Sequence, residues 1–196
     1  MGHDNREIEK KFLVAGKTLQ ETKELIEAIV KECSSDSGRS KDCYWHPKAG
    51  MKADFVRLRY MPDGTGQMTV KYSDKGSNLD RIEIDVEVAD PHQALSFLAQ
   101  IHGEPAYNIT KNFHSFWVDE EKSTNISTYQ IEGDSRVFLE VESRDLNQLT
   151  HFESLLGTAV VLEHEERSLY QIFIKQKGDK NESRKRIRRQ DQDKQT

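Results

Sequence analysis

Glutamate and lysine recur at every second position in Glu7-Ile8-Glu9-Lys10-Lys11-Phe12. Alternate side chains of an extended strand point to the same side, so Glu7, Glu9 and Lys11 would share one face. Two carboxylates about 7 Å apart along a strand can bind a hard divalent cation, and the lysine can bind an anion that the cation attracts. A strand whose charged face is simply solvated gives the same pattern.

Charged residues also alternate with apolar ones in later segments, all of which predict strands. A half-exposed sheet alternates in the same way. Acids and arginines at strict intervals of two, however, suit the lumen of a closed barrel, where opposite charges can pair and bind a ligand. The apolar faces would then point outward and need helices to cover them. The charged positions are Arg57 and Arg59, Lys71, Arg81 with Glu83, Asp85 and Glu87, and Glu140 with Glu142.

Apolar stripes at helical spacing predict helices over residues 19–32, 91–102 and 146–156, and a short one over 167–174. We expect Gly103 and Gly157 to end the second and third of these helices. The segment 62–66 predicts a turn that joins two strands into a hairpin. The first three helices begin at capping signals, which are Thr18 with Glu21, Asp90 before Pro91, and Asp145 with Gln148.

Length and composition favour one domain over residues 1–177 and a basic tail over 178–196. No apolar stretch approaches the length of a membrane span. Cys33 and Cys43 lack the spacing of a zinc site, which predicts a reducing, cytoplasmic location. The whole chain has a net charge of −5, although residues 175–196 hold nine basic and four acidic residues. The tail is expected to be a solubilising extension, with a nuclear signal or an RNA-contacting arm as alternatives.

In the order of its motifs the sequence resembles the CYTH group of the triphosphate tunnel metalloenzymes, which includes class IV adenylate cyclases, thiamine triphosphatases and inorganic triphosphatases. The resemblance covers residues 5–175. Its motifs are the glutamates and lysine at 7, 9 and 11, Asp42-Cys43-Tyr44-Trp45, Arg57-Leu58-Arg59, Lys71, Arg81-Ile82-Glu83-Ile84-Asp85, Phe138-Leu139-Glu140-Val141-Glu142, and Arg167-Ser168-Leu169-Tyr170.

The resemblance implies an α+β fold, a closed eight-stranded antiparallel β-barrel that forms a tunnel with a polar lumen and is covered by helices. It implies a small-molecule triphosphate or ATP as the ligand, and Mg²⁺ or Mn²⁺ as the cofactor. Fixed cations would replace the hydration of the phosphates in such a tunnel. The metal ligands would be Glu7, Glu9, Glu140, Glu142 and Asp85. The phosphate-binding residues would be Lys11, Arg57, Arg59, Lys71, Arg81, Lys111 and His114, and the catalytic residues Lys11, Glu83 and Lys111.

Two positions depart from the pattern of that family. Phe113 stands where an arginine usually follows two residues after Lys111, and His114 could replace this arginine if the register slips by one residue. Gln130 stands where an acidic residue is frequent, and glutamine cannot serve as a negative metal ligand. These changes are compatible with altered substrate choice, weaker catalysis or a retired active site.

We therefore expect metal-dependent hydrolysis of a linear triphosphate, such as tripolyphosphate or a nucleoside or thiamine triphosphate. A class IV-type adenylate cyclase is the first alternative, although no feature of the sequence indicates a base pocket. The others are a nucleotide- or polyphosphate-binding protein without turnover and an RNA 5′-triphosphatase that uses the basic tail. No membrane partner is expected, and the sequence is compatible with a monomer or a homodimer.

Overall fold

The computed structural model of the chain describes residues 6–30, 34–73, 80–119 and 123–173. The chain divides into two compact units, residues 1–166 and 167–196. In the second unit, residues 169–173 are helical, and Ser168 and Gln171 bond each other reciprocally at the start of this helix. The basic tail predicted for 178–196 lies outside the described residues.

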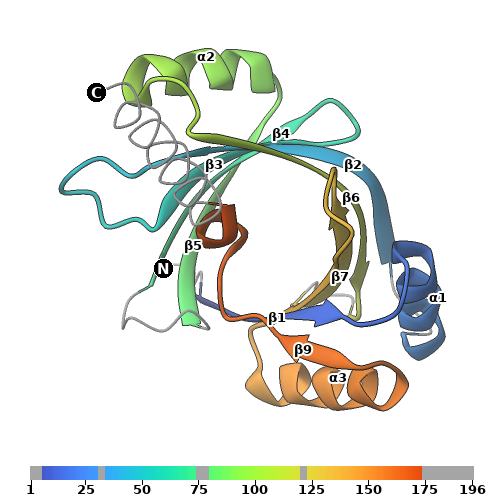
Figure 1. Ribbon diagram of the computed structural model, residues 1–196. Coiled ribbons are helices and arrows are strands. Elements are labelled where there is room, and N and C mark those ends of the chain that lie inside the picture. The colour runs from blue at the N-terminus through green and yellow to red at the C-terminus, as the bar shows by residue number, and fades with distance from the viewer. Residues whose placement is uncertain (1–5, 31–33, 74–79, 120–122, 174–196) are drawn as a thin grey trace, which may run out of the picture. The chain divides into compact units, whose positions relative to one another are not determined.

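The strands of the first unit form one antiparallel sheet in the order β5-β4-β3-β2-β6-β7-β8-β1-β9. The sheet curves so that β1 lies beside β8 and also comes beside β5 (Figure 1), with which it pairs at Arg6–Ile8. The strands are β1 (Arg6–Val14), β2 (Ser34–Trp45), β3 (Phe55–Tyr60), β4 (Gly66–Ser73), β5 (Asp80–Val88), β6 (Tyr107–Trp117), β7 (Thr124–Ile131), β8 (Val137–Ser143) and β9 (Leu162–His164).

The predicted α+β fold built on an antiparallel sheet is confirmed. The sheet has nine strands where eight were expected, because the short strand β9 pairs with the end of β1, at Phe12–Val14. Closure of the sheet into an eight-stranded barrel stays a prediction. Within the described ranges no helix is long and apolar enough to cross a membrane.

Two helices, α1 (Leu19–Ile29) and α3 (Leu146–Ala159), cover one stretch of the outer face of the sheet. Phe12, Ile126 and Leu139 point outward from three neighbouring strands and pack with Ile26 of α1 and Leu149 of α3. Burying such side chains contributes roughly 1.5–3 kcal/mol each. The expected cover of helices over outward apolar faces is therefore present here.

Helix α2 (Pro91–His102) covers the outer face of β3 and β4. Leu98 of α2 packs with Val56 and Leu58 of β3. The cover does not extend over all of β5, where Ile84 and Val86 keep 44% and 50% of their surfaces exposed.

The helix starts follow the expected signals, but two helix ends differ from the predictions. Helix α1 ends at Ile29, with Val30 as its cap, instead of extending to residue 32. Thr18 and Glu21 form the capping box of α1, and the Asp90 carboxylate caps α2. Gly103 ends α2 at a φ of 80°. The prediction that Gly157 ends α3 was wrong, because the helix continues to Ala159 and Val160 caps it in an extended conformation.

The predicted turn joins β3 to β4 in a hairpin, and Gly64 adopts a positive φ of 89° there. At the start of β4, Gly66 lies under the first turn of α2. A Cβ added to Gly66 would lie 2.8 Å from Cβ of Pro91 and 3.1 Å from the carbonyl oxygen of Arg59. Neither neighbour is the flexible end of a side chain, so neither can move aside easily. The close approach of α2 to the backbone of β4 therefore requires glycine at this position.

We predict that Gly66→Ala lowers the free energy of unfolding by about 1–3 kcal/mol, because the added methyl group forces α2 away from β4. The matched control is Gly157→Ala, whose Cβ would meet nothing within 4 Å inside α3. That variant should be more stable than the wild type by up to about 1 kcal/mol. Urea unfolding followed by circular dichroism measures both. Equal midpoints for Gly66→Ala and the wild type would contradict this packing.

Candidate functional site

The face of the sheet opposite the helices, here called the inner face, carries charged side chains that are nearly buried. Their registers bring them together: Glu9 of β1 lies opposite Glu142 of β8, and Lys11 lies opposite Glu140. Lys11 is 5% exposed and Lys111 of β6 is 6% exposed. Charges that have lost so much hydration must be paired with each other.

Glu9 is shared by two lysines. Its Oε1 lies 3.1 Å from Nζ of Lys11, and its Oε2 lies 2.9 Å from Nζ of Lys71 on β4. The same lysines also bind a second carboxylate each, Lys11 to Glu140 at 3.0 Å and Lys71 to Glu83 of β5 at 2.7 Å. Burial alone would lower the pKa of Lys11, but Glu140 and Glu9 raise it. Lys11 therefore stays charged inside the protein.

Three carboxylates of this network form a candidate cation site. Glu9, Glu140 and Glu142 each offer an oxygen, and these oxygens all lie within 4.8 Å of one another. Ligands of one Mg²⁺ or Mn²⁺ ion, with bonds of about 2.0–2.4 Å, span such a distance. Burial and then the neighbouring Glu9 raise the pKa of Glu142 well above its usual range. Glu142 therefore keeps its proton to a higher pH than an ordinary glutamate.

The arginines of β3 extend the network toward β2. Arg57 donates from Nη2 to Oγ1 of Thr69 at 2.8 Å and lies 3.4 Å from Glu83, while its buried Nε has no hydrogen-bond partner among the described residues. Arg59 donates from Nε and Nη2 to the two oxygens of Asp42, at 2.8 and 2.9 Å. An unsatisfied guanidinium N–H on the inner face is a donor for an anion.

Lys111 completes the basic group. Its Nζ lies 3.8 Å from Oδ2 of Asp42 and 4.6 Å from the centre of the Tyr129 ring. Burial and the nearby Arg59 lower the pKa of Lys111 to about 8. Tyr129 donates its hydroxyl proton to Glu140 at 2.7 Å, which links Lys111 to the acidic cluster. Lys111 can therefore gain or lose a proton near neutral pH.

Most of the residues predicted for the site come together on the inner face. They are Glu9, Lys11, Arg57, Arg59, Lys71, Glu83, Lys111, Glu140 and Glu142. Asp85 lies nearby and accepts a hydrogen bond from Thr69; burial and Glu83 raise its pKa. Glu7 and Arg81 are opposite each other in the pairing of β1 with β5, but their side chains lie outside the described residues.

His114 is the predicted residue that the structure places elsewhere. Strand β6 keeps its regular alternation, so His114 points to the side opposite Lys111, the side on which Phe116 packs into the outer core. Lys23 and Glu27 of α1 are the charges near it. Phe113 does stand on the inner face, where it lies opposite Tyr129.

Gln130 also points to the outer face, since it pairs with Val137 while Tyr129 pairs with Phe138. The inner positions of β7 that lie opposite Glu140 and Glu142 are Ser127 and Asn125. The described inner face of β7 therefore carries no acidic residue. The spacing predicted that Gln130 takes the place of this acid, but Gln130 lies on the other face of the strand.

Sequence reasoning missed Asp42 and Tyr129 as parts of the site. Asp42 lies on a strand whose charged residues, Asp36, Arg39, Lys41 and Asp42, do not alternate regularly, and Tyr129 lies on a strand without any charged residue. Asp42 and Tyr44 alternate along β2, and in the pairing of β2 with β3 they are the direct partners of Arg59 and Arg57. This alternation is the signal that could have placed Asp42 on the inner face.

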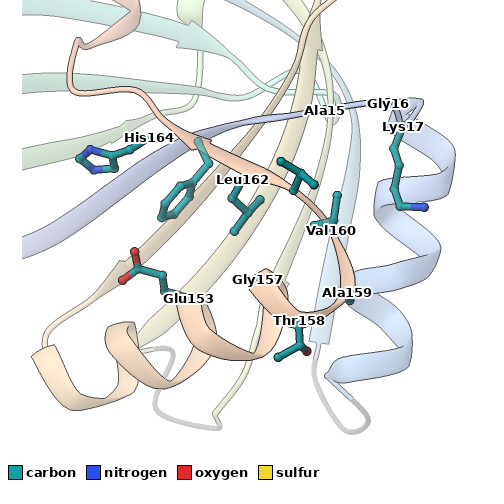
Figure 2. Close-up of a pocket in the computed structure, with 12 residues that line it drawn as sticks. Ala15, Gly16, Lys17, Glu153, Gly157, Thr158, Ala159, Val160, Leu162 and His164 are labelled. Carbon is teal, nitrogen blue, oxygen red and sulfur yellow. The ribbon is translucent and has the colours of Figure 1, made fainter.

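A pocket of about 800 Å³ lies away from this site, between β1, β9 and the end of α3 (Figure 2). Phe12, Val160 and Leu162 line it with small and apolar groups, and Glu153 and His164 lie at its edge. Phe12 belongs to the outer face of β1, so this pocket opens on the other side of the strand from Glu9 and Lys11. Its lining includes one lysine, Lys17, and one acid, Glu153, so it lacks the group of basic side chains found on the inner face.

Known structures share the fold of this chain. A proposed adenylate cyclase from Vibrio parahaemolyticus is 19% identical, with a TM-score of 0.65 over 87% of this chain and 99% of that chain. A proposed adenylyl cyclase from Hippeastrum with a dominant triphosphatase activity is 12% identical, with a TM-score of 0.62 over 86% and 95%. A chain of the Mediator head module from Schizosaccharomyces pombe is 11% identical, with a TM-score of 0.58 over 80% and 97%.

No protein-family model and no curated protein matches the sequence. The solved structures confirm the resemblance to the triphosphate tunnel metalloenzymes at the level of the fold alone.

We predict that the effect of Glu142→Gln on the free energy of unfolding of the cation-free protein is about 1–2 kcal/mol more stabilising at pH 8 than at pH 5. Glu142 binds its proton more tightly in the folded chain, so its contribution to stability is present below its unfolded pKa and is lost as the pH rises through its folded pKa. Urea unfolding in EDTA at the two pH values measures the difference. The exposed Glu163→Gln is the control. Parallel pH profiles for Glu142→Gln and the wild type would contradict the raised pKa.

Proposed function

We propose that this protein binds a linear triphosphate together with Mg²⁺ or Mn²⁺ on the inner face of the sheet and hydrolyses it. One observation carries the proposal. Three carboxylates close enough to share a cation lie beside basic side chains from four strands, namely Lys11, Arg57, Arg59, Lys71 and Lys111. A triphosphate carries about four negative charges, and such a set of donors can replace its hydration.

The proposal includes closure of the sheet. The pairing of β1 with β5 at Glu7 and Arg81 supports an eight-stranded barrel, with β9 added outside the ring. In a closed barrel the inner face becomes the wall of a tunnel, where water is scarce and each ion pair with a phosphate is stronger.

The lysines can change partners when the ligand arrives. Without ligand, Lys11 and Lys71 are bound to Glu9, Glu140 and Glu83. A cation at Glu9, Glu140 and Glu142 would take over the charge of these carboxylates. Both lysines then keep their positions and can donate to phosphate oxygens instead, so the site is prepared for the ligand before it binds.

In hydrolysis, Arg57, Arg59 and the two lysines would hold the phosphates and orient the terminal phosphorus. The cation, when bound, would supply charge neutralisation and an activated water. Lys111, whose pKa of about 8 lies close to neutral pH, can donate a proton toward a leaving phosphate oxygen or hold one near the attacking water. Glu83 keeps Lys71 charged and fixed during these steps.

We predict that Glu140→Gln lowers Mn²⁺-dependent release of orthophosphate from tripolyphosphate by about a hundredfold or more, because the cation loses a charged ligand. Phosphorus NMR of tripolyphosphate and of ATP, incubated in parallel, gives the rates. Glu163→Gln, an exposed change on β9, should match the wild type. An unchanged rate in Glu140→Gln would refute the role of the cluster. Cyclic AMP and pyrophosphate from ATP would identify the cyclase reaction instead.

Phe113 favours a second candidate, a protein that binds a triphosphate without turning it over. An apolar ring on the inner face, two residues after Lys111, cannot donate a hydrogen bond to phosphate. The same fold also occurs in a chain of the Mediator head module. Tight binding without product in the NMR experiment would support this candidate.

We predict that Phe113→Arg lowers the Kd of tripolyphosphate about tenfold, because a guanidinium on the inner face adds a charge-assisted hydrogen bond. Isothermal titration calorimetry measures the change. Asn112→Arg places the same charge at an exposed neighbouring position of β6 and should change Kd little. Equal Kd values for Phe113→Arg and the wild type would mean that phosphate does not reach this part of the inner face.

A further inference from the structure

Asp42 is the most deeply buried charged residue that the described sheet contains, and it lies behind the basic residues rather than among them. Its side chain is 0% exposed, whereas Arg59, which it binds, keeps 20% of its side chain exposed. A ligand on the inner face can therefore reach Arg59 but not Asp42. Any effect of Asp42 on a ligand must pass through the residues that it holds.

The contact between the two residues fixes the guanidinium in one orientation. Asp42 Oδ1 accepts from Nε of Arg59 at 2.8 Å, and Oδ2 accepts from Nη2 at 2.9 Å. A guanidinium has five N–H groups in one plane, so this two-point contact uses one edge and leaves three N–H groups directed away from Asp42. Rotation about the end of the side chain would break both bonds at once.

Two further groups hold the carboxylate itself in place. Tyr44 donates its hydroxyl proton to Oδ2 at 3.4 Å, and Nζ of Lys111 lies 3.8 Å from the same oxygen. Burial alone would raise the pKa of Asp42, but Arg59 and then Lys111 hold it below its usual range. Asp42 is thus a fixed anion that contacts two of the residues proposed to bind phosphate.

We propose that Asp42 is a positioning residue. It fixes the guanidinium of Arg59 through Nε and Nη2, so that the N–H groups directed away from Asp42 are aimed at a phosphate oxygen. The inference rests on the proposed function, since it assigns a role within triphosphate binding. Its energetic logic is preorganisation: the cost of ordering a long side chain is met when the protein folds, and not again when the ligand binds.

The sign of the effect separates this role from that of a bystander charge. A carboxylate near an anion site repels the anion, so removing a bystander would strengthen triphosphate binding. Removing a positioning residue weakens binding, because Arg59 loses the contact that orients it. Asp42→Asn keeps the size of the side chain and removes the charge.

The test is a double-mutant cycle on binding of imido-bridged tripolyphosphate with Mg²⁺, measured by calorimetry in the wild type, Asp42→Asn, Arg59→Met and the double variant. We expect Asp42→Asn to raise Kd about tenfold when Arg59 is present, and less than about twofold when Arg59 is replaced by methionine. An equal factor in both backgrounds, or a lower Kd in Asp42→Asn, would overturn the proposal.

The control is another pair with the same chemistry. Arg136 donates to both oxygens of Asp134, so Asp134→Asn breaks an arginine–aspartate contact that lies outside the proposed machinery. This variant should leave Kd unchanged, and a rise as large as that of Asp42→Asn would overturn the specific role of Asp42. If the wild-type protein binds no triphosphate, the proposed function is refuted, and this role with it. If the wild type binds triphosphate and Asp42→Asn binds it equally well, only the role of Asp42 is refuted.

A second measurement does not require the Asp42→Asn variant. The NMR signal of the Arg59 Nε–H group, assigned by its loss in Arg59→Met, should stay protected from exchange with water before and after the ligand is added. Loss of protection on binding would mean that phosphate displaces Asp42 from this edge, and would overturn the proposal even if Asp42→Asn fails to fold.

Discussion

The pairing of nearly buried charges on the inner face is the constraint on which the rest of the site depends. Glu9 holds Lys11 and Lys71 at once, and each lysine also holds an acid from another strand. Glu9, Lys11 and Lys71 could not stay charged at 5–8% exposure without their partners, because the loss of hydration costs several kcal/mol per ion. The registers of β1, β4, β5 and β8 are therefore tied to one another through side chains as well as through backbone hydrogen bonds.

Such a network is both stable and ready to exchange. The acids that stabilise the lysines in the ligand-free chain are the oxygen ligands that a divalent cation prefers. In the proposed function the two roles do not conflict, because a cation that takes over the carboxylates would arrive with an anion for the lysines. Asp42 differs from the other acids, since its side chain is 0% exposed; in the proposal above it keeps its partner, Arg59, when the ligand binds. Permanent and exchangeable ion pairs thus divide the inner face between them.

Much of this arrangement could be predicted from the sequence, because charges at intervals of two fix which residues share a face. The rule succeeded for β1, β3 and β8. The predictions for His114 and Gln130 failed because a family pattern was placed above this rule; both residues keep the ordinary alternation and point outward. The alternation of Asp42 with Tyr44 indicates the face on which Asp42 lies but not its role, because that role depends on the pairing of β2 with β3. The extra strand β9 is three residues long and carries no pattern that sequence alone could reveal.

The most direct test of the account is a crystal structure of the protein with Mn²⁺ and imido-bridged tripolyphosphate, with the metal located by its anomalous scattering. We predict a manganese peak among Glu9, Glu140 and Glu142, and phosphate oxygens within hydrogen-bonding distance of Lys11 and Lys71. Manganese bound elsewhere, or both lysines still paired with Glu9 while the triphosphate lies away from the inner face, would contradict it.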